Sequence, residues 1–217
     1  AGDLELPFGD SEQTMALIRE QTAAILKDGK RPLMLGGEHS LTLGAVQAAL
    51  EQYPQLHLIH FDAHTDLREE YLGVRYSHAS VIRRCWDLMG DGRIAQFGIR
   101  SGERSEFAWA KEHTHLRPFD FTGLEDVMAA WNKDGKPIYF TLDLDVLDPG
   151  FFPGTGTPEA GGVSFKELMK AIQLVMTGNV VACDVMELAP GLDMSGVSTA
   201  TACKVVREML LLWSASK

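Results

Sequence analysis

Short apolar runs alternate with longer amphipathic segments along most of the chain. The apolar runs have the length and composition of buried strands, and they cover residues 32–36, 56–61, 94–99, 137–144 and 180–188. Segments with helical periodicity lie between and around them, at about 11–27, 40–52, 78–88, 103–112, 122–132, 164–177 and 199–213. Buried strands separated by helices are typical of a parallel sheet covered by helices. The pattern therefore predicts an α/β fold with three layers, α/β/α, around a mainly parallel sheet.

Two helix starts and one long loop carry local signals. Ser11 is expected to cap the first helix, and Ser164, with Glu167 three residues on, predicts a capping box. Residues 150–162, "GFFPGTGTPEAGG", form a Gly/Pro-rich loop. No Lys-Ser/Thr pair follows its glycines, so we expect a structured connection rather than a phosphate-binding P-loop.

Length and composition fit a single domain over residues 1–217, with 45% hydrophobic residues. No apolar run approaches the ~18 residues of a membrane span, and the first residues do not resemble a signal peptide. The formal net charge of −10 disfavours a nucleic-acid partner and is compatible with a small cationic substrate. The three scattered cysteines favour a reducing compartment, and we expect a cytoplasmic protein without disulfides or a CxxC zinc site.

Ionisable residues follow four of the apolar runs. In open α/β sheets, ligands bind outside the carboxyl ends of the strands, so these residues are expected to share one location. They are Glu38 and His39, then Asp62, His64 and Asp66, then Asp143, Asp145 and Asp148, and finally Asp184 and Glu187.

The spacing of these residues predicts a site for two metal ions. Extended residues two apart point the same way, so Asp62, His64 and Asp66 can converge on one point, as can Asp143 and Asp145. Four crowded carboxylates repel one another, and two divalent cations would balance their charge. Oxygen ligands with imidazoles and no thiolate favour Mn²⁺, with Fe²⁺ and Co²⁺ as alternatives. The competing interpretation, solvated aspartates that cap the following helices, is preferred for one aspartate alone but not for both motifs together.

The segments "GGEHS", "DAHTD", "TLDLDVLDPGFFPGTGTPEAGG" and "DVMELAP" resemble the ureohydrolase (arginase/agmatinase) family of binuclear manganese enzymes. The similarity runs along essentially the whole chain, and "SHAS" and "FGIRSG" resemble bacterial agmatinases in particular. The resemblance implies an arginase-like fold, two Mn²⁺ per chain and a homotrimer or homohexamer. The opening "AGDLELPFGD" resembles the interior of an agmatinase, so we expect the chain to lack an N-terminal segment of its relatives.

The family pattern implies a ligand set. His39, Asp62, Asp66 and Asp143 would hold one Mn²⁺, and Asp62, His64, Asp143 and Asp145 the other, with Asp62 and Asp143 bridging. Asp184 is a candidate for orienting a ligand histidine from behind. Thr141 replaces a serine common in the family. The remaining histidines have no motif around them and are interpreted as structural or surface residues: His57, His60, His113 and His115.

The resemblance also implies two catalytic residues. His78 matches a histidine proposed to move a proton, and Glu187 matches the carboxylate that receives the guanidinium, which is planar and suits a bidentate partner. The alternatives are a surface or capping role for His78 and an ordinary strand-end ion pair for Glu187. Asp148, offset from the Asp143 face, is interpreted as a turn residue.

The implied activity is hydrolysis of agmatine to putrescine and urea by a metal-bridging hydroxide, a step in polyamine biosynthesis. Residues 67–77 are few and unlike the polar segment with which arginases recognise the arginine α-carboxylate. Glu69 or Glu70 could attract a distal ammonium, whereas Arg68 or Arg75 could meet a carboxylate. The alternatives are therefore guanidinobutyrate or arginine as the substrate, or a non-catalytic metal-binding relative.

Overall fold

The computed structural model describes residues 1–215, and within them the strands form one parallel sheet. Its order is β1-β6-β5-β2-β3-β4, and every neighbouring pair runs parallel. The strands are β1 (Leu33–Leu35), β2 (His57–Phe61), β3 (Ile94–Ile99), β4 (His115–Pro118), β5 (Pro137–Asp143) and β6 (Asn179–Met186).

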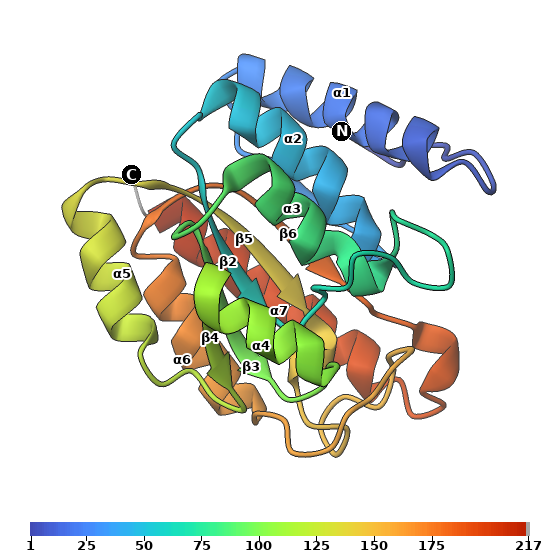
Figure 1. Cartoon of the computed structure of the whole chain (residues 1–217). Coiled ribbons are helices and arrows are strands. Elements are labelled where there is room, and N and C mark those ends of the chain that lie inside the picture. Colours follow the sequence, from blue (N-terminus) through green and yellow to red (C-terminus); the bar gives the residue numbers. More distant parts are fainter. Residues whose placement is uncertain (216–217) are drawn as a thin grey trace.

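Helices cover both faces of this sheet (Figure 1). They are α1 (Ser11–Lys27), α2 (Thr42–Gln52), α3 (Val81–Met89), α4 (Arg104–His113), α5 (Leu124–Lys133), α6 (Phe165–Val175) and α7 (Val197–Ala215). Alternate strand residues face opposite ways. Leu58 and Tyr139 pack in the core with α1 to α4, and Ile59 and Phe140 pack with α5 to α7. The predicted three-layer α/β fold is therefore confirmed.

The central strands match the predicted runs closely, but the two edges of the sheet differ from the prediction. β4 was not expected, because its four residues, "HLRP", are half polar and lie at an edge, where no continuous apolar run is needed. At the other edge, β1 has three residues and Leu35 is 64% exposed, so this strand is not buried on both faces.

Of the two predicted helix caps, one is confirmed and the other lies one residue earlier in the sequence. The capping box of Ser164 and Glu167 is present. Asp10, rather than Ser11, caps α1, and its carboxylate accepts the backbone N–H of Gln13 at 2.9 Å. In the described part of the chain, no helix combines the length and apolar character needed to cross a membrane.

Candidate metal centre

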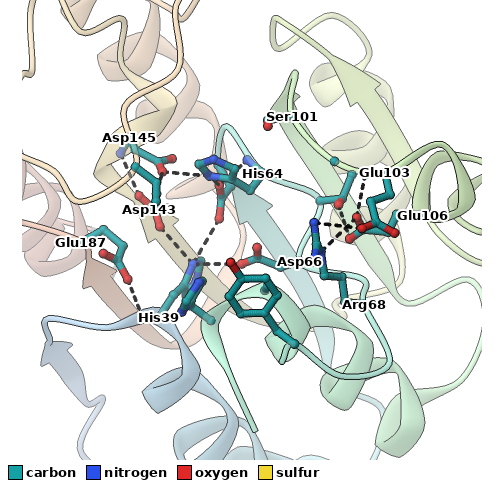
Figure 2. Close-up of a pocket in the computed structure, with 17 residues that line it drawn as sticks. His39, His64, Asp66, Arg68, Ser101, Glu103, Glu106, Asp143, Asp145 and Glu187 are labelled. Carbon is teal, nitrogen blue, oxygen red and sulfur yellow. Dashed lines mark hydrogen bonds and ion pairs between the residues drawn. The ribbon is translucent and has the colours of Figure 1, made fainter. Parts of the chain in front are cut away.

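The ionisable residues at the strand ends gather around one cavity of about 280 Å³ at the carboxyl edge of the sheet (Figure 2). All six predicted ligands and both predicted catalytic residues line this cavity: His39, Asp62, His64, Asp66, His78, Asp143, Asp145 and Glu187. Since they come from the ends of β1, β2, β5 and β6 and from the segment before α3, the parallel topology is what brings them together.

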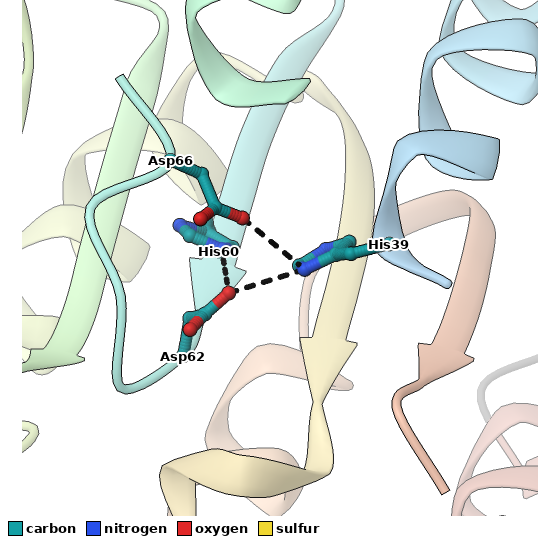
Figure 3. Close-up of side chains that lie close together, drawn as sticks. All are labelled: His39, His60, Asp62 and Asp66. Atoms are coloured by element: carbon teal, nitrogen blue, oxygen red, sulfur yellow. Dashed lines mark hydrogen bonds and ion pairs between the residues drawn. The ribbon is translucent and has the colours of Figure 1, made fainter. Parts of the chain in front are cut away.

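His39 faces three carboxylates with a ring nitrogen. Its Nδ1 lies 3.1 Å from Oδ2 of Asp62, 3.4 Å from Oδ2 of Asp66 and 3.1 Å from Oδ2 of Asp143. Figure 3 shows the ring pointing toward Asp62 and Asp66. This Nδ1 is buried and makes no hydrogen bond of acceptable geometry within the described residues. A buried polar atom without such a partner is unusual, and a cation held by the surrounding oxygens would satisfy it.

A second group of possible ligands shares Asp62 with the first. Nδ1 of His64 lies 2.9 Å from Oδ2 of Asp145 and 3.3 Å from Oδ1 of Asp62. Asp62 thus presents one oxygen toward His39 and the other toward His64. A carboxylate placed between two clusters in this way can bridge two cations. The geometry therefore suits a binuclear site.

The local backbone conformation sets the direction of two of these carboxylates, those of Asp143 and Asp66. Asp143 ends β5 and caps the 3₁₀ turn Leu144–Val146, where its Oδ1 accepts the backbone N–H of Asp145 at 2.8 Å. Its Oδ2 remains directed at His39. The capping and the ligand interpretations of this aspartate are therefore compatible. Asp66 reaches the site with a φ of 54°, which is rare for a residue other than glycine and is typically retained at functional sites.

In the protein without ions, two of these carboxyl groups and His64 have raised pKa values and so hold protons more readily. Burial, together with the charges of Asp145 and Asp62, raises the pKa of Asp143 well above its usual range. Burial and the charge of Asp62 do the same for the pKa of Asp66. Burial alone would lower the pKa of His64, but the carboxylates of Asp145 and Asp62 raise it to about 12. Cations entering the cavity would displace these protons.

Buried hydroxyl groups link the far side of the His39 ring to Asp184. Nε2 of His39 lies 2.8 Å from Oγ1 of Thr141, which in turn lies 3.4 Å from Oγ1 of Thr42. Thr42 and Tyr139 donate to Oδ2 of Asp184 at 2.8 and 2.6 Å. Because the Thr42 proton points at Asp184, the Thr42 oxygen accepts from Thr141, and the Thr141 oxygen accepts the proton on Nε2 of His39. Nδ1 keeps its lone pair, so the residues present fit a divalent cation.

Glu187 turns into the cavity directly after β6, with a φ of 64°. Its Oε1 accepts the backbone N–H of His39 at 2.8 Å, and its own N–H donates to the carbonyl of Gly37 at 2.7 Å. These two contacts fix the carboxylate against the cavity wall and leave Oε2 for a ligand. Burial raises the pKa of Glu187.

His78 lies at the rim of the cavity, at the start of the 3₁₀ turn His78–Ser80. Its side chain is about half exposed, and its Nδ1 lies 3.3 Å from Oε1 of Glu38. The hydrogen bond with Glu38 raises the pKa of His78. The histidine therefore combines access to solvent with a carboxylate partner that favours its protonated form.

The outer wall of the cavity contains three charged residues: Arg68, which the sequence suggested as a substrate-facing residue, and Glu103 and Glu106, which sequence reasoning missed. Arg68 lies between two carboxylates, with its Nη2 3.2 Å from Oε1 of Glu103 and its Nε 3.7 Å from Oε2 of Glu106. Glu106 is buried and also accepts the hydroxyl of Thr65 at 2.6 Å. Glu103 and Glu106 follow β3, so the strand-end rule applied to that strand would have pointed to them.

The residues that the sequence suggested for the far end of a substrate mostly lie elsewhere. Glu69 and Glu70 are absent from the cavity lining, and Glu69 pairs with Arg83 at 3.1 Å. Arg75 also lies outside the lining and pairs with Asp87 at 3.4 Å. The expectation of a substrate-facing Glu69, Glu70 or Arg75 was therefore wrong, because residues 67–77 turn these side chains away from the cavity.

Arg100 and Asp148 fix the Gly/Pro-rich loop, residues 150–162, beside the metal centre. The Arg100 guanidinium donates to the carbonyl oxygens of Asp145 and Glu159 at 2.8 and 2.9 Å. Asp148 accepts the backbone N–H groups of Gly150 at 2.9 Å and of the loop's last two glycines. Asp148 is thus a turn residue, as predicted, and the loop is an ordered wall of the cavity.

Together, the parallel α/β fold and the buried His/Asp cluster at its strand ends define a protein of the arginase-like fold class with a site suited to two metal ions. The chain belongs to the Arginase family, whose model matches residues 1–212, and it is a ureohydrolase. This agrees with the resemblance found in its motifs.

Individual relatives agree with this assignment. The chain is 46% identical to an agmatinase of Bacillus anthracis over 216 residues, which covers 98% of this chain and 74% of that protein. It is 34% identical to a mitochondrial guanidino acid hydrolase of Homo sapiens over 185 residues, covering 76% of this chain and 50% of the human protein. A crystal structure from Clostridium difficile, provisionally named an agmatinase, superposes with a TM-score of 0.94 at 48% identity and covers 99% of this chain and 78% of that chain.

Proposed function

We propose that this protein hydrolyses agmatine to putrescine and urea with two Mn²⁺ bound in the cavity. The observation that carries the proposal is the buried Nδ1 of His39, which lacks a hydrogen-bond partner in the described structure and lies within 3.4 Å of oxygens from three carboxylates. His39, Asp62, Asp66 and Asp143 would hold one ion, and Asp62, His64, Asp143 and Asp145 the other. When bound, such a pair supplies a nucleophile from water near neutral pH.

Glu187 is the residue suited to orient the guanidinium group. Its carboxylate lies on the cavity wall close to the first ligand group, because it accepts the backbone N–H of His39. A planar, forked guanidinium binds a carboxylate through two N–H donors, which fixes the position of its central carbon. The strained φ of 64° at Glu187 is consistent with a side chain held in place for this purpose.

His78 is the residue suited to move a proton to the leaving amine. It lines the same cavity, and its contact with Glu38 favours the protonated ring. A histidine that is partly exposed can regain its proton from solvent after each turnover. Glu38 would then act through His78 by keeping the ring oriented toward the cavity.

The outer wall of the cavity favours a cationic substrate over a guanidino acid. Arg68 is the basic residue that lines this wall, and Glu103 and Glu106 already balance its charge. An ammonium group would meet a surplus of carboxylate, whereas a substrate carboxylate would have to compete for Arg68. Agmatine has a terminal ammonium, so we prefer it to guanidinobutyrate, the type of substrate that the name of the human relative suggests.

The protein is proposed to act in the cytoplasm, in polyamine biosynthesis, as a homotrimer or homohexamer without a nucleic-acid or membrane partner. These proposals follow from the family resemblance, the scattered cysteines and the acidic charge of −10. Light scattering coupled to gel filtration measures the oligomeric state, and a monomeric mass would contradict it.

The decisive test is urea release with Mn²⁺ against agmatine, arginine and guanidinobutyrate, for the wild type and for Asp143→Ala. We expect agmatine to be the preferred substrate, and we expect the variant to lose activity together with bound metal, because a shared ligand is removed. Glu69→Ala, on the surface outside the cavity, is a matched control that should keep both. An Asp143→Ala variant with wild-type turnover and metal content would refute the site.

A further inference from the structure

His60 stands beside the metal centre in a position that permits two roles. Its Nε2 lies 2.8 Å from Oδ2 of Asp62, and the ring is fully buried. Its ligand atoms lie close enough to those of His39, Asp62 and Asp66 for it to be a further metal ligand (Figure 3). It could equally donate a hydrogen bond to Asp62 and never touch an ion. The position of the ring proton decides between these roles, since a ligand nitrogen must offer a lone pair.

Gln96 decides where that proton lies. This residue of β3 is fully buried, and its Nε2 lies 3.1 Å from Nδ1 of His60. The same amide nitrogen donates to the backbone carbonyl of Thr65 at 2.8 Å, and the amide oxygen accepts the hydroxyl of Thr114 at 3.1 Å. A flipped amide would direct its oxygen at the carbonyl oxygen of Thr65, which would place two acceptors 2.8 Å apart without a proton between them. The network therefore has one consistent orientation, in which Gln96 is the donor to His60.

Because Gln96 donates to Nδ1, the proton of the neutral His60 ring lies on Nε2, which points at Asp62. That nitrogen has no lone pair for an ion. We infer that His60 is a positioning residue: held by Gln96, it donates to Oδ2 of Asp62 and thereby sets the direction in which the shared carboxylate faces both metal positions. The inference deepens the proposed function and rests on its metal centre.

The test compares two substitutions of His60 by the affinity and stoichiometry of Mn²⁺ binding, measured by titration calorimetry and metal analysis. His60→Gln keeps an N–H donor near the position of Nε2, whereas His60→Leu removes it. We expect His60→Gln to bind two Mn²⁺ with affinity within about threefold of the wild type, and His60→Leu to lose about tenfold or more, as is typical when a hydrogen-bond partner of a ligand is removed. Equal, large losses in both variants would identify His60 as a ligand and overturn the inference.

Gln96→Glu gives a second test, in which only the positioning role predicts a loss of Mn²⁺ affinity. A glutamate would draw the ring proton to Nδ1 and deprive Asp62 of its donor, so a positioning His60 predicts weaker Mn²⁺ binding. A ligating His60 would instead gain basicity from the new carboxylate, and affinity would rise or hold. Should Gln96→Glu fail to fold, the comparison of His60→Gln with His60→Leu still distinguishes the two roles.

A matched control is available on the same strand. His57→Leu also removes a largely buried histidine of β2, at the end away from the cavity, where its ring contacts Trp131 and the carbonyl of Gln55. It should change the melting temperature without changing Mn²⁺ affinity. A wild type that binds no divalent ion would overturn the proposed function and this inference together. A wild type that binds two ions, with both His60 variants equally impaired, would overturn the inference alone.

Discussion

Nε2 of His39 lies 2.8 Å from Oγ1 of Thr141, and both side chains are buried. The contact joins the segment after β1 to β5, although β6 lies between these two strands in the sheet. It assigns the ring proton of His39 to the side away from the carboxylates. The hydroxyl of Thr141 therefore keeps the lone pair of His39 on Nδ1, where an ion can bind.

Thr141→Val should weaken Mn²⁺ binding by about tenfold or more, because an isosteric side chain without the hydroxyl leaves Nε2 of His39 unpartnered. Thr141→Ser keeps the hydroxyl and should bind nearly as the wild type does. Calorimetric titration of both variants checks this, with a thermal melt to control for packing. Equal affinities in Val and Ser would show that the hydroxyl does not set the His39 tautomer.

The metal-free protein should lose stability progressively as the pH rises above about 6.5, the unfolded pKa of histidine, toward the folded pKa of about 12 for His64. Burial opposes the shift, but neighbouring carboxylates raise the pKa of His39 well above its usual range and that of His64 to about 12. A group with a raised pKa stabilises the fold below its unfolded pKa, and this contribution is lost as pH rises through the folded value. The raised pKa values of Asp66 and Asp143 act in the same direction.

Bound Mn²⁺ should reverse this trend, because the ions replace the protons and bind better when fewer must be displaced. The melting-temperature gain on adding Mn²⁺ should therefore increase with pH over the same window. Differential scanning fluorimetry with and without Mn²⁺ measures it. A gain that is constant or falls with pH would contradict the ligand assignment. Asp62, whose pKa is lowered, acts oppositely but only below about pH 4.

Glu103→Ala should shift substrate preference away from a cation. The change removes one of the two carboxylates that balance Arg68, so the freed guanidinium would repel an ammonium and attract a carboxylate. We expect the ratio of kcat/KM for agmatine over guanidinobutyrate to fall by about tenfold, which corresponds to ~1.4 kcal/mol. Steady-state urea release on both substrates measures the ratio. An unchanged ratio would remove Arg68 and Glu103 from substrate recognition.

Arg100→Met should loosen the Gly/Pro-rich loop. The guanidinium binds the carbonyls of Asp145 and Glu159, so its loss leaves partly buried carbonyl groups without these donors. We expect the free energy of unfolding to fall by about 3 kcal/mol and proteases to cut faster within residues 150–162. Arg117→Met, which breaks a surface pair with Asp120, is the control and should change neither. Unaltered protease resistance in Arg100→Met would disprove the role.

The central strands and the placement of the metal motifs could be predicted from the sequence because both depend on local patterns. A buried parallel strand requires a continuous apolar run, and the carboxyl ends of parallel strands meet at one edge of the sheet. Asp143, which ends β5, and Asp145, in the turn that follows it, therefore share one edge with the "DAHTD" segment. The edge strand β4 was missed because a partly exposed strand needs no such run.

The residues that hydrogen-bond to the histidines of the site could not be predicted, because these hydrogen bonds join segments that are far apart in the sequence. Gln96 lies 36 residues from His60, and Thr141 lies 102 residues from His39. No local pattern marks a glutamine on one strand that will orient a histidine on the preceding strand. His60 was accordingly interpreted as structural, and the contact with Asp62 is what gives it a place beside the metal centre.

The order of the strands has a consequence for how the protein is made. β1, which leads into His39, pairs with β6 near the end of the chain, and the backbone N–H of His39 donates to Glu187, 148 residues later. A chain emerging from the ribosome therefore carries "DAHTD" long before β5 and β6 exist to complete the cavity. Ion capture must therefore wait until β5 and β6 have been made, and a chain truncated before β6 would lack the strand against which β1 holds His39.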